Sequence, residues 1–104
     1  MRIYKRMEEL REDYIKLPKE LVQEMLYDLL ILETEYPDID AAQVLLLEGA
    51  AELDAIYRLF PYLQNLVAEV DETVRCKDNT SYRKIVWIIS DDGIGLVAFI
   101  RNGI

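Results

Sequence analysis

The sequence of 104 residues contains no histidine, a single cysteine and no long apolar run. Without histidine, Ser–His and Cys–His nucleophile pairs, histidine metal ligands and a histidine pH switch are excluded. Cys76 has no second thiol in this chain with which to form a disulfide, which fits a reducing compartment. The longest apolar runs, Leu29–Leu32 and Val44–Leu47, fall far below the about 20 residues that span a membrane, and the basic N-terminus lacks the apolar run of a secretory signal. We therefore expect a cytoplasmic protein without membrane association, cofactor or metal.

Negative charge is in excess and is concentrated in the middle of the chain. The sequence has 20 acidic and 12 basic residues, a formal net charge of −8. Residues 20–74 hold thirteen acidic side chains and one basic side chain, Arg58, which gives this block a net charge of −12. Such a block repels phosphate backbones and disfavours direct binding of nucleic acid. It favours a basic protein partner.

Apolar residues recur at steps of three and four through most of the chain, which predicts amphipathic helices. We expect four helices, over residues 2–17, 18–35, 41–60 and 61–75. Pro18 suits the first position of a helix, where its missing N–H costs little. Residues 41–60 are apolar nearly all round the helical circumference, so this helix is expected at the centre of a bundle.

The chain ends with two β-prone runs within residues 82–101, which predict an antiparallel hairpin. Asp92–Gly93 is expected as the turn and pairs Ile89 with Leu96. The prediction is a single α+β domain, residues 1–104, in which a three- to four-helix bundle precedes the hairpin.

Both faces of this hairpin are apolar, whereas a hairpin that lies on one layer of helices needs only one apolar face. The other face carries Val86, Ile88, Val97 and Phe99. A lone two-stranded hairpin is marginal in water. We therefore predict a homodimer in which these four residues form the oligomer interface.

The outer face of the predicted helix 18–35 combines acidic and apolar side chains. At 100° per residue, this face collects six residues: Glu20, Glu24, Tyr27, Asp28, Ile31 and Glu35. An exposed tyrosine and isoleucine surrounded by carboxylates are typical of a recognition patch with a polar rim. We predict that these six residues bind a protein partner.

The favoured function is that of a small, acidic, non-catalytic protein that acts by protein–protein association, as an inhibitor, immunity or regulatory factor. A variant of this function is a nucleic-acid mimic, whose carboxylates imitate phosphates on a DNA-binding protein. A further possibility is a structural subunit of a larger assembly.

The alternative is enzymatic and rests on paired carboxylates. Glu69 and Glu72 form a Glu-x-x-Glu pair, which resembles the all-α nucleotide pyrophosphohydrolases; the second motif of that family, Glu-x-x-Asp, is not matched by Glu52-Leu53-Asp54. The resemblance implies Mg²⁺-dependent hydrolysis of nucleotides. The carboxylates that would serve this reaction are Glu24, Asp28, Glu48 and Glu52.

Overall fold

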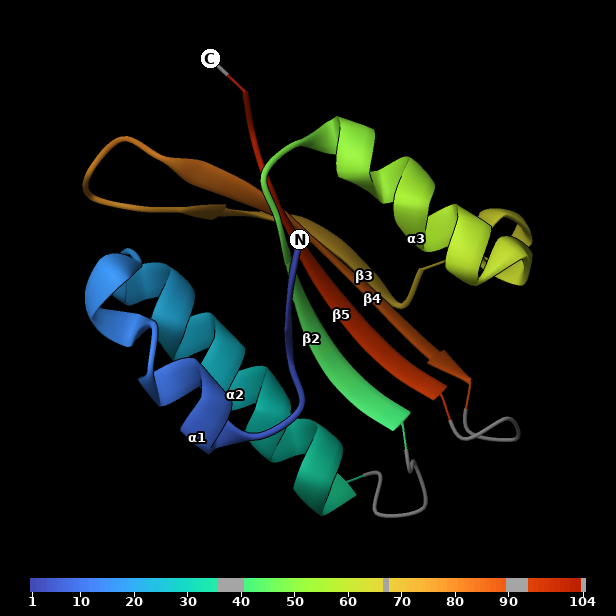
Figure 1. Cartoon of the computed structure of the whole chain (residues 1–104), viewed down its shortest axis with the longest axis horizontal. Coiled ribbons are helices and arrows are strands. Elements are labelled where there is room, and N and C mark those ends of the chain that lie inside the picture. The colour runs from blue at the N-terminus through green and yellow to red at the C-terminus, as the bar shows by residue number, and fades with distance from the viewer. Residues whose placement is uncertain (36–40, 67, 90–93, 104) are drawn as a thin grey trace.

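The computed structural model, which describes residues 1–35, 41–66, 68–89 and 94–103, contains a five-stranded mixed sheet between two layers of helix (Figure 1). The elements, in chain order, are β1 (Arg2–Tyr4), α1 (Met7–Arg11), the 3₁₀ helix η1 (Tyr14–Lys16), α2 (Lys19–Glu35), β2 (Ala41–Leu47), η2 (Ala50–Glu52), α3 (Leu53–Leu59), η3 (Pro61–Asn65), β3 (Val70–Arg75), β4 (Ser81–Ile89) and β5 (Ile94–Arg101). Among the described residues, no helix combines the length and the hydrophobicity needed to cross a bilayer.

The strands lie in the order β1-β2-β5-β4-β3, with β1 and β3 at the two edges. The central pair, β2 and β5, is parallel, and the other pairs are antiparallel. A parallel pair is normally covered on both faces. Here α1 and α2 lie on one face and α3 on the other (Figure 1).

The predicted helical bundle is wrong, and the clearest error concerns residues 41–60. This stretch forms strand β2, the short helix η2 and the two-turn helix α3. The apolar run Val44–Leu47 is buried throughout because β2 has helices above and below it. A run that is apolar on every side suits a doubly covered strand as well as a central helix, and periodicity alone does not separate the two.

Two other predicted helices are also replaced. Residues 2–17 form β1, α1 and η1, and residues 61–75 form η3 and β3. β3 is joined to β4 by a tight turn in which Asn79 has a positive φ of 70° and Asp78 accepts a hydrogen bond from the Thr80 N–H at 3.0 Å. Asparagine tolerates a positive φ, and an aspartate side chain can accept a hydrogen bond from the backbone two residues further on, so both residue types are common in such turns. The predicted helix 18–35 coincides with α2.

The β4–β5 hairpin differs from its predicted register by two residues. Ile89 pairs with Ile94, not with Leu96, and Trp87 pairs with Leu96. Because strand side chains alternate, a shift of two keeps every residue on its expected face. The predicted turn at Asp92–Gly93 lies outside the described residues.

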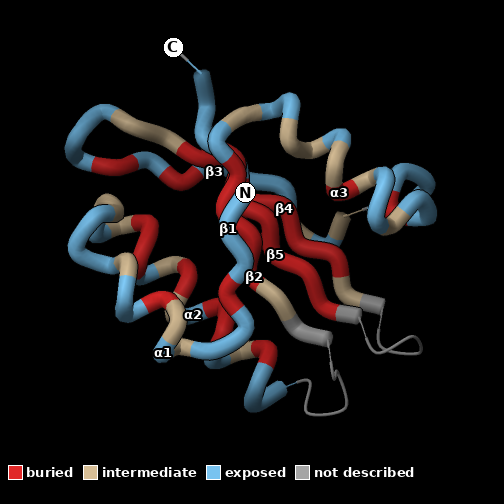
Figure 2. The backbone as a smooth tube through the Cα atoms, in the orientation of Figure 1, coloured by how far each residue is buried: buried red, intermediate tan, exposed pale blue. Residues whose placement is uncertain are grey.

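The apolar side chains of the sheet form two cores, one on each face, and the strands are buried along most of their central length (Figure 2). The core under α1 and α2 contains Leu10, Met25 and Phe99, all fully buried. The core under α3 contains Ile56, Trp87 and further residues of β2 and β5. Each strand of the β4–β5 hairpin therefore contributes to both cores.

The four residues predicted as an oligomer interface lie on the face of the sheet that α2 covers. Val86, Val97 and Phe99 are buried against α2 within the same chain, and Ile88 packs at the margin of that core. Helices of this chain thus cover the apolar side chains on both faces of the hairpin, from Ile85 to Trp87 and from Leu96 to Ile100. The reason for assigning these side chains to a second copy disappears, since they are core residues.

We expect Phe99→Ala to lower the free energy of unfolding by roughly 3–5 kcal/mol, because it opens a cavity beside α2. Ile15→Ala is the control, since Ile15 is 84% exposed and surface truncations change stability by about 0.5 kcal/mol or less. Urea denaturation measures both variants, with light scattering alongside. A dimer that dissociates on Phe99→Ala without loss of monomer stability would instead support the predicted interface.

Candidate functional site

The predicted acidic patch on α2 is divided between the surface and the sheet. Tyr27 is 60% exposed, whereas Asp28 is 7% exposed and faces the sheet. Glu20, Glu24 and Ile31 are partly buried, and Glu35 is exposed. Leu30, which is not one of the six predicted residues, is 48% exposed. The outer face of α2 is therefore rotated from its predicted position, and Asp28 belongs to the interior.

Asp28 is buried because it binds Lys84 of β4. The Lys84 ammonium lies 2.9 Å from Asp28 Oδ1, 3.2 Å from Glu24 Oε2 and 4.0 Å from Glu72 Oε1. It also lies 5.8 Å from the centre of the Phe99 ring. A buried ammonium must be paired and hydrogen-bonded. Helix α2 and strand β3 supply the carboxylates that allow a lysine on the apolar face of β4.

The surroundings favour the charged form of Lys84 but disfavour the charged form of Asp28. Burial raises the pKa of the Asp28 carboxyl above its ordinary value, and Lys84 only partly offsets this. Burial alone would lower the pKa of Lys84, but hydrogen bonds and charges of Asp28 and Glu24 outweigh it, so that pKa is raised. The difference arises because several carboxylates share one ammonium. Asp28 Oδ2 is buried and, within the described part of the chain, has no hydrogen-bond partner, which also disfavours its ionised form.

A groove of about 390 Å³ lies between α2 and β3, next to the Lys84 cluster. Its lining consists of Glu20, Gln23, Glu24 and Tyr27 from α2 and residues 72–75 from β3. The lining carries three carboxylates, those of Glu20, Glu24 and Glu72, and one guanidinium, that of Arg75. Its formal charge is therefore −2.

Strand β3 leaves one side of its backbone without a partner strand among the described residues. The Cys76 N–H donates to the Thr80 carbonyl at 2.9 Å, next to the Arg75–Ser81 pair. Because hydrogen-bonded and non-hydrogen-bonded pairs alternate in an antiparallel ladder, the backbone groups of Asp71, Thr73 and Arg75 point away from β4. The acidic groove thus borders an open sheet edge.

The carboxylates of the proposed Mg²⁺ site do not converge. Glu24 and Asp28 bind Lys84, whereas Glu52 lies in η2, which follows the C-terminal end of β2. There its carboxylate accepts hydrogen bonds from the N-terminal ammonium at 3.0 Å and from the Glu48 N–H at 3.1 Å. Glu72 lies on a strand, so the Glu-x-x-Glu spacing does not place it on a helix face with Glu69. No group of metal-ligating side chains that could hold an ion is found in the described ranges.

Lys84 was not selected from the sequence as a site residue, although a signal was present. Lys84 shares one face of β4 with three apolar or aromatic residues, Tyr82, Val86 and Ile88. A lysine within an otherwise apolar face requires a buried carboxylate partner. That partner lies 56 residues away in sequence, so the sequence pattern did not identify it.

Comparisons with protein-family models, curated proteins and solved structures find no match for this chain.

We expect Lys84→Met to lower the free energy of unfolding by roughly 3–5 kcal/mol at pH 7, because it leaves buried Asp28 without a counter-ion. The double variant Lys84→Met/Asp28→Leu should recover much of this loss, since apolar replacements of a buried pair are often neutral. Arg83→Met is the matched control on the neighbouring residue. Its exposed pair with Asp71, at 2.7 Å, should contribute about 1 kcal/mol or less. Equal losses for the two single variants would contradict this account.

The pH dependence of stability should reveal the raised pKa of Asp28. The folded protein binds the Asp28 proton at a higher pH than the unfolded chain, whose value is near 3.8. Wild type should therefore gain stability relative to Asp28→Asn as pH falls from 7 towards 4. Urea unfolding of both proteins at each pH gives this difference. A difference that moved in the opposite direction would mean that Lys84 holds the folded-state pKa below its ordinary value.

Proposed function

We propose that this chain is a non-catalytic, cytoplasmic protein that acts by binding another protein. The partner presents an extended basic segment, which lies in the groove between α2 and β3. The observation that carries this proposal is the acidic lining of the groove beside an open strand edge.

Charge supports a basic partner. The groove lining has a formal charge of −2, within a chain whose net charge is −8. Lysine or arginine side chains of a partner would contact Glu20, Glu24 and Glu72. Such complementarity accelerates association and rejects acidic partners.

The open edge of β3 supports an extended segment. A peptide added to a sheet edge gains backbone hydrogen bonds, and here the groups of Asp71, Thr73 and Arg75 are available. Charged side chains along an edge also prevent pairing between copies of the same strand. The carboxylate of Glu72 therefore favours a basic strand over a second copy of β3.

Exposed apolar side chains supply an anchor next to the charges. Tyr27 and Leu30 are 60% and 48% exposed, and they lie three residues apart on the same side of α2. Aromatic residues beside a polar rim commonly carry much of the energy of an interface. Tyr27 lines the groove itself, so a segment lying there would contact its ring.

Tyr27→Ala and Glu72→Gln test this proposal without removing Asp28 or Lys84. Each variant should weaken binding of the partner at least tenfold, because the first removes the anchor and the second a charge. Partners captured from cell extract and identified by mass are purified, and their affinities for wild type and variants are measured by titration calorimetry.

Tyr14→Ala and Glu33→Gln are the matched controls, since Tyr14 is exposed outside the groove and Glu33 lies on another side of α2. Both should bind as wild type does. Equal effects of control and groove variants would contradict the proposed surface. If DNA competes with the chain for its partner, the nucleic-acid mimic becomes the better description.

A further inference from the structure

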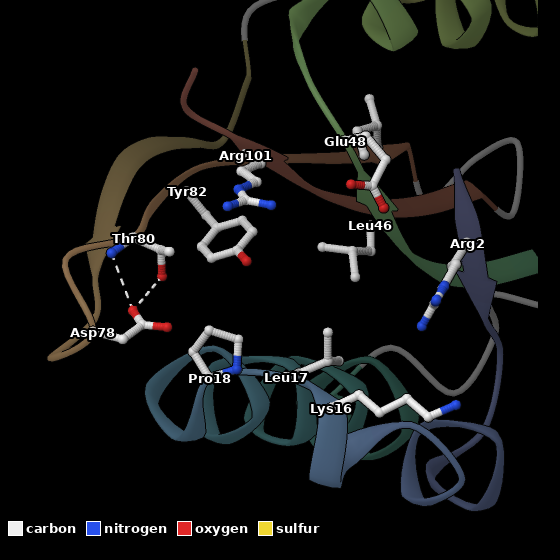
Figure 3. A pocket seen from close by; sticks show the side chains of 11 residues that line it. Arg2, Lys16, Leu17, Pro18, Leu46, Glu48, Asp78, Thr80, Tyr82 and Arg101 are labelled. Carbon is white, nitrogen blue, oxygen red and sulfur yellow. Dashed lines mark hydrogen bonds between the residues drawn. The ribbon is translucent and has the colours of Figure 1, made fainter. Parts of the chain in front are cut away.

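A second pocket, of about 300 Å³, opens beside the N-terminal end of α2 (Figure 3). Its floor is formed by the ends of β2, β4 and β5, and its opposite wall by the junction between η1 and α2. Five separate elements and the β3–β4 turn contribute to its lining, which is the mark of a site built by the tertiary fold. Its volume is at the lower end of the range for small-molecule sites, roughly 300–1,000 Å³.

Tyr82 provides a polar group directed into this pocket. The residue is 5% exposed, and its hydroxyl points into the space between the strands and the η1–α2 junction (Figure 3). No side chain among the described residues hydrogen-bonds to this hydroxyl. Burial raises the pKa of Tyr82 above its ordinary value, so the hydroxyl keeps its proton at neutral pH and can donate it in a hydrogen bond. Because the hydroxyl faces the open space of the pocket, it is available to an acceptor that binds there.

Arg101 is the cross-strand neighbour of Tyr82. The two residues lie on β5 and β4, and both reach into the pocket. In the described part of the chain, neither Arg101 nor Lys16 has a carboxylate within 4.0 Å. A guanidinium and a hydroxyl that converge in this way suit a carboxylate, which accepts hydrogen bonds on both oxygens.

The total charge of the lining disfavours a dianion relative to a monoanion. Three cations, Arg2, Lys16 and Arg101, face two carboxylates, those of Glu48 and Asp78, which gives a formal charge of +1. Arg2 is also paired with Asp13 outside the lining, at 3.5 Å. With Asp13 counted, the groups around the pocket have no net charge, so a dianion such as phosphate would exceed the positive charge available and would meet both carboxylates.

We propose that this pocket binds a small organic monocarboxylate. The carboxylate lies between the Arg101 guanidinium and the Tyr82 hydroxyl, and the apolar body of the ligand contacts Leu17, Pro18 and Leu46. Leu17 and Pro18 lie across the open space from Arg101, and Leu46 lies on the strand beside β5 (Figure 3). The site does not depend on the proposed partner-binding groove, whose lining shares no residue with it.

The test is a titration of the full chain with benzoate and with 3-phenylpropionate, followed by amide NMR shifts and by calorimetry. Their neutral amides, inorganic phosphate and sulfate serve as comparison ligands. We expect at least one carboxylate to bind saturably and to shift the amides of Lys16, Tyr82 and Arg101. Tyr82→Phe should weaken binding by roughly tenfold, as expected for one hydrogen bond to a charged group, and Arg101→Gln should weaken it further.

Tyr62→Phe and Arg58→Gln are the matched controls, because both residues lie on the opposite side of the sheet and outside the pocket. Both should bind the carboxylate as wild type does. Three results would overturn the proposal: no saturable binding by either carboxylate, equal binding of the neutral amides, or tighter binding of phosphate or sulfate. Unchanged affinity in both Tyr82→Phe and Arg101→Gln would also overturn it.

Discussion

The position of α2 on the sheet depends on one buried ammonium. Lys84 occupies the apolar face of β4, and its charge is accommodated because Asp28 and Glu24 lie at 2.9 and 3.2 Å. These two carboxylates are four residues apart, so they project from the same side of α2. Packing alone would tolerate small rotations of an amphipathic helix, whereas the ion pairs fix one rotation. That rotation turns Tyr27 and Leu30 to the surface and brings Glu20 and Glu24 to the side of β3. The acidic groove is thus a consequence of how the lysine is buried.

The two-sided burial of the sheet explains the second constraint. The parallel pairing of β2 with β5 places Val44 opposite Val97 and Leu46 opposite Phe99. Parallel strands need a covering layer on each face, and the two layers come from different parts of the chain, α1 and α2 before β2, and α3 after it. The hairpin therefore needs no second copy to cover it. Its two apolar faces, which suggested dimerisation, instead indicate a central position in a three-layer domain.

Sequence patterns predicted some of this fold, and the failures have physical causes. The faces of β4 and β5 were predictable because side chains alternate with a period of two, which a register shift of two does not change. Strand β2 was not, because a four-residue apolar run fits a buried strand and a buried helix equally well. In the candidate site, Tyr27 was correctly expected at the surface. Asp28, only 100° further round the helix, was misplaced because its burial depends on Lys84, and helical periodicity contains no information about a partner on a distant strand.

The two pockets share no lining residue, but the β3–β4 turn connects their surroundings. The Lys77 N–H donates to the Glu20 carboxylate at 3.2 Å, and Glu20 lines the acidic groove. The next residue, Asp78, lines the other pocket and is held by hydrogen bonds from the Thr80 N–H and hydroxyl. The β3–β4 loop is thereby hydrogen-bonded to the N-terminal end of α2. Lys84 fixes this helix on the sheet. Both surfaces therefore depend on the position of α2 that the buried ion cluster sets, although the cluster contributes side chains to the acidic groove and none to the other pocket.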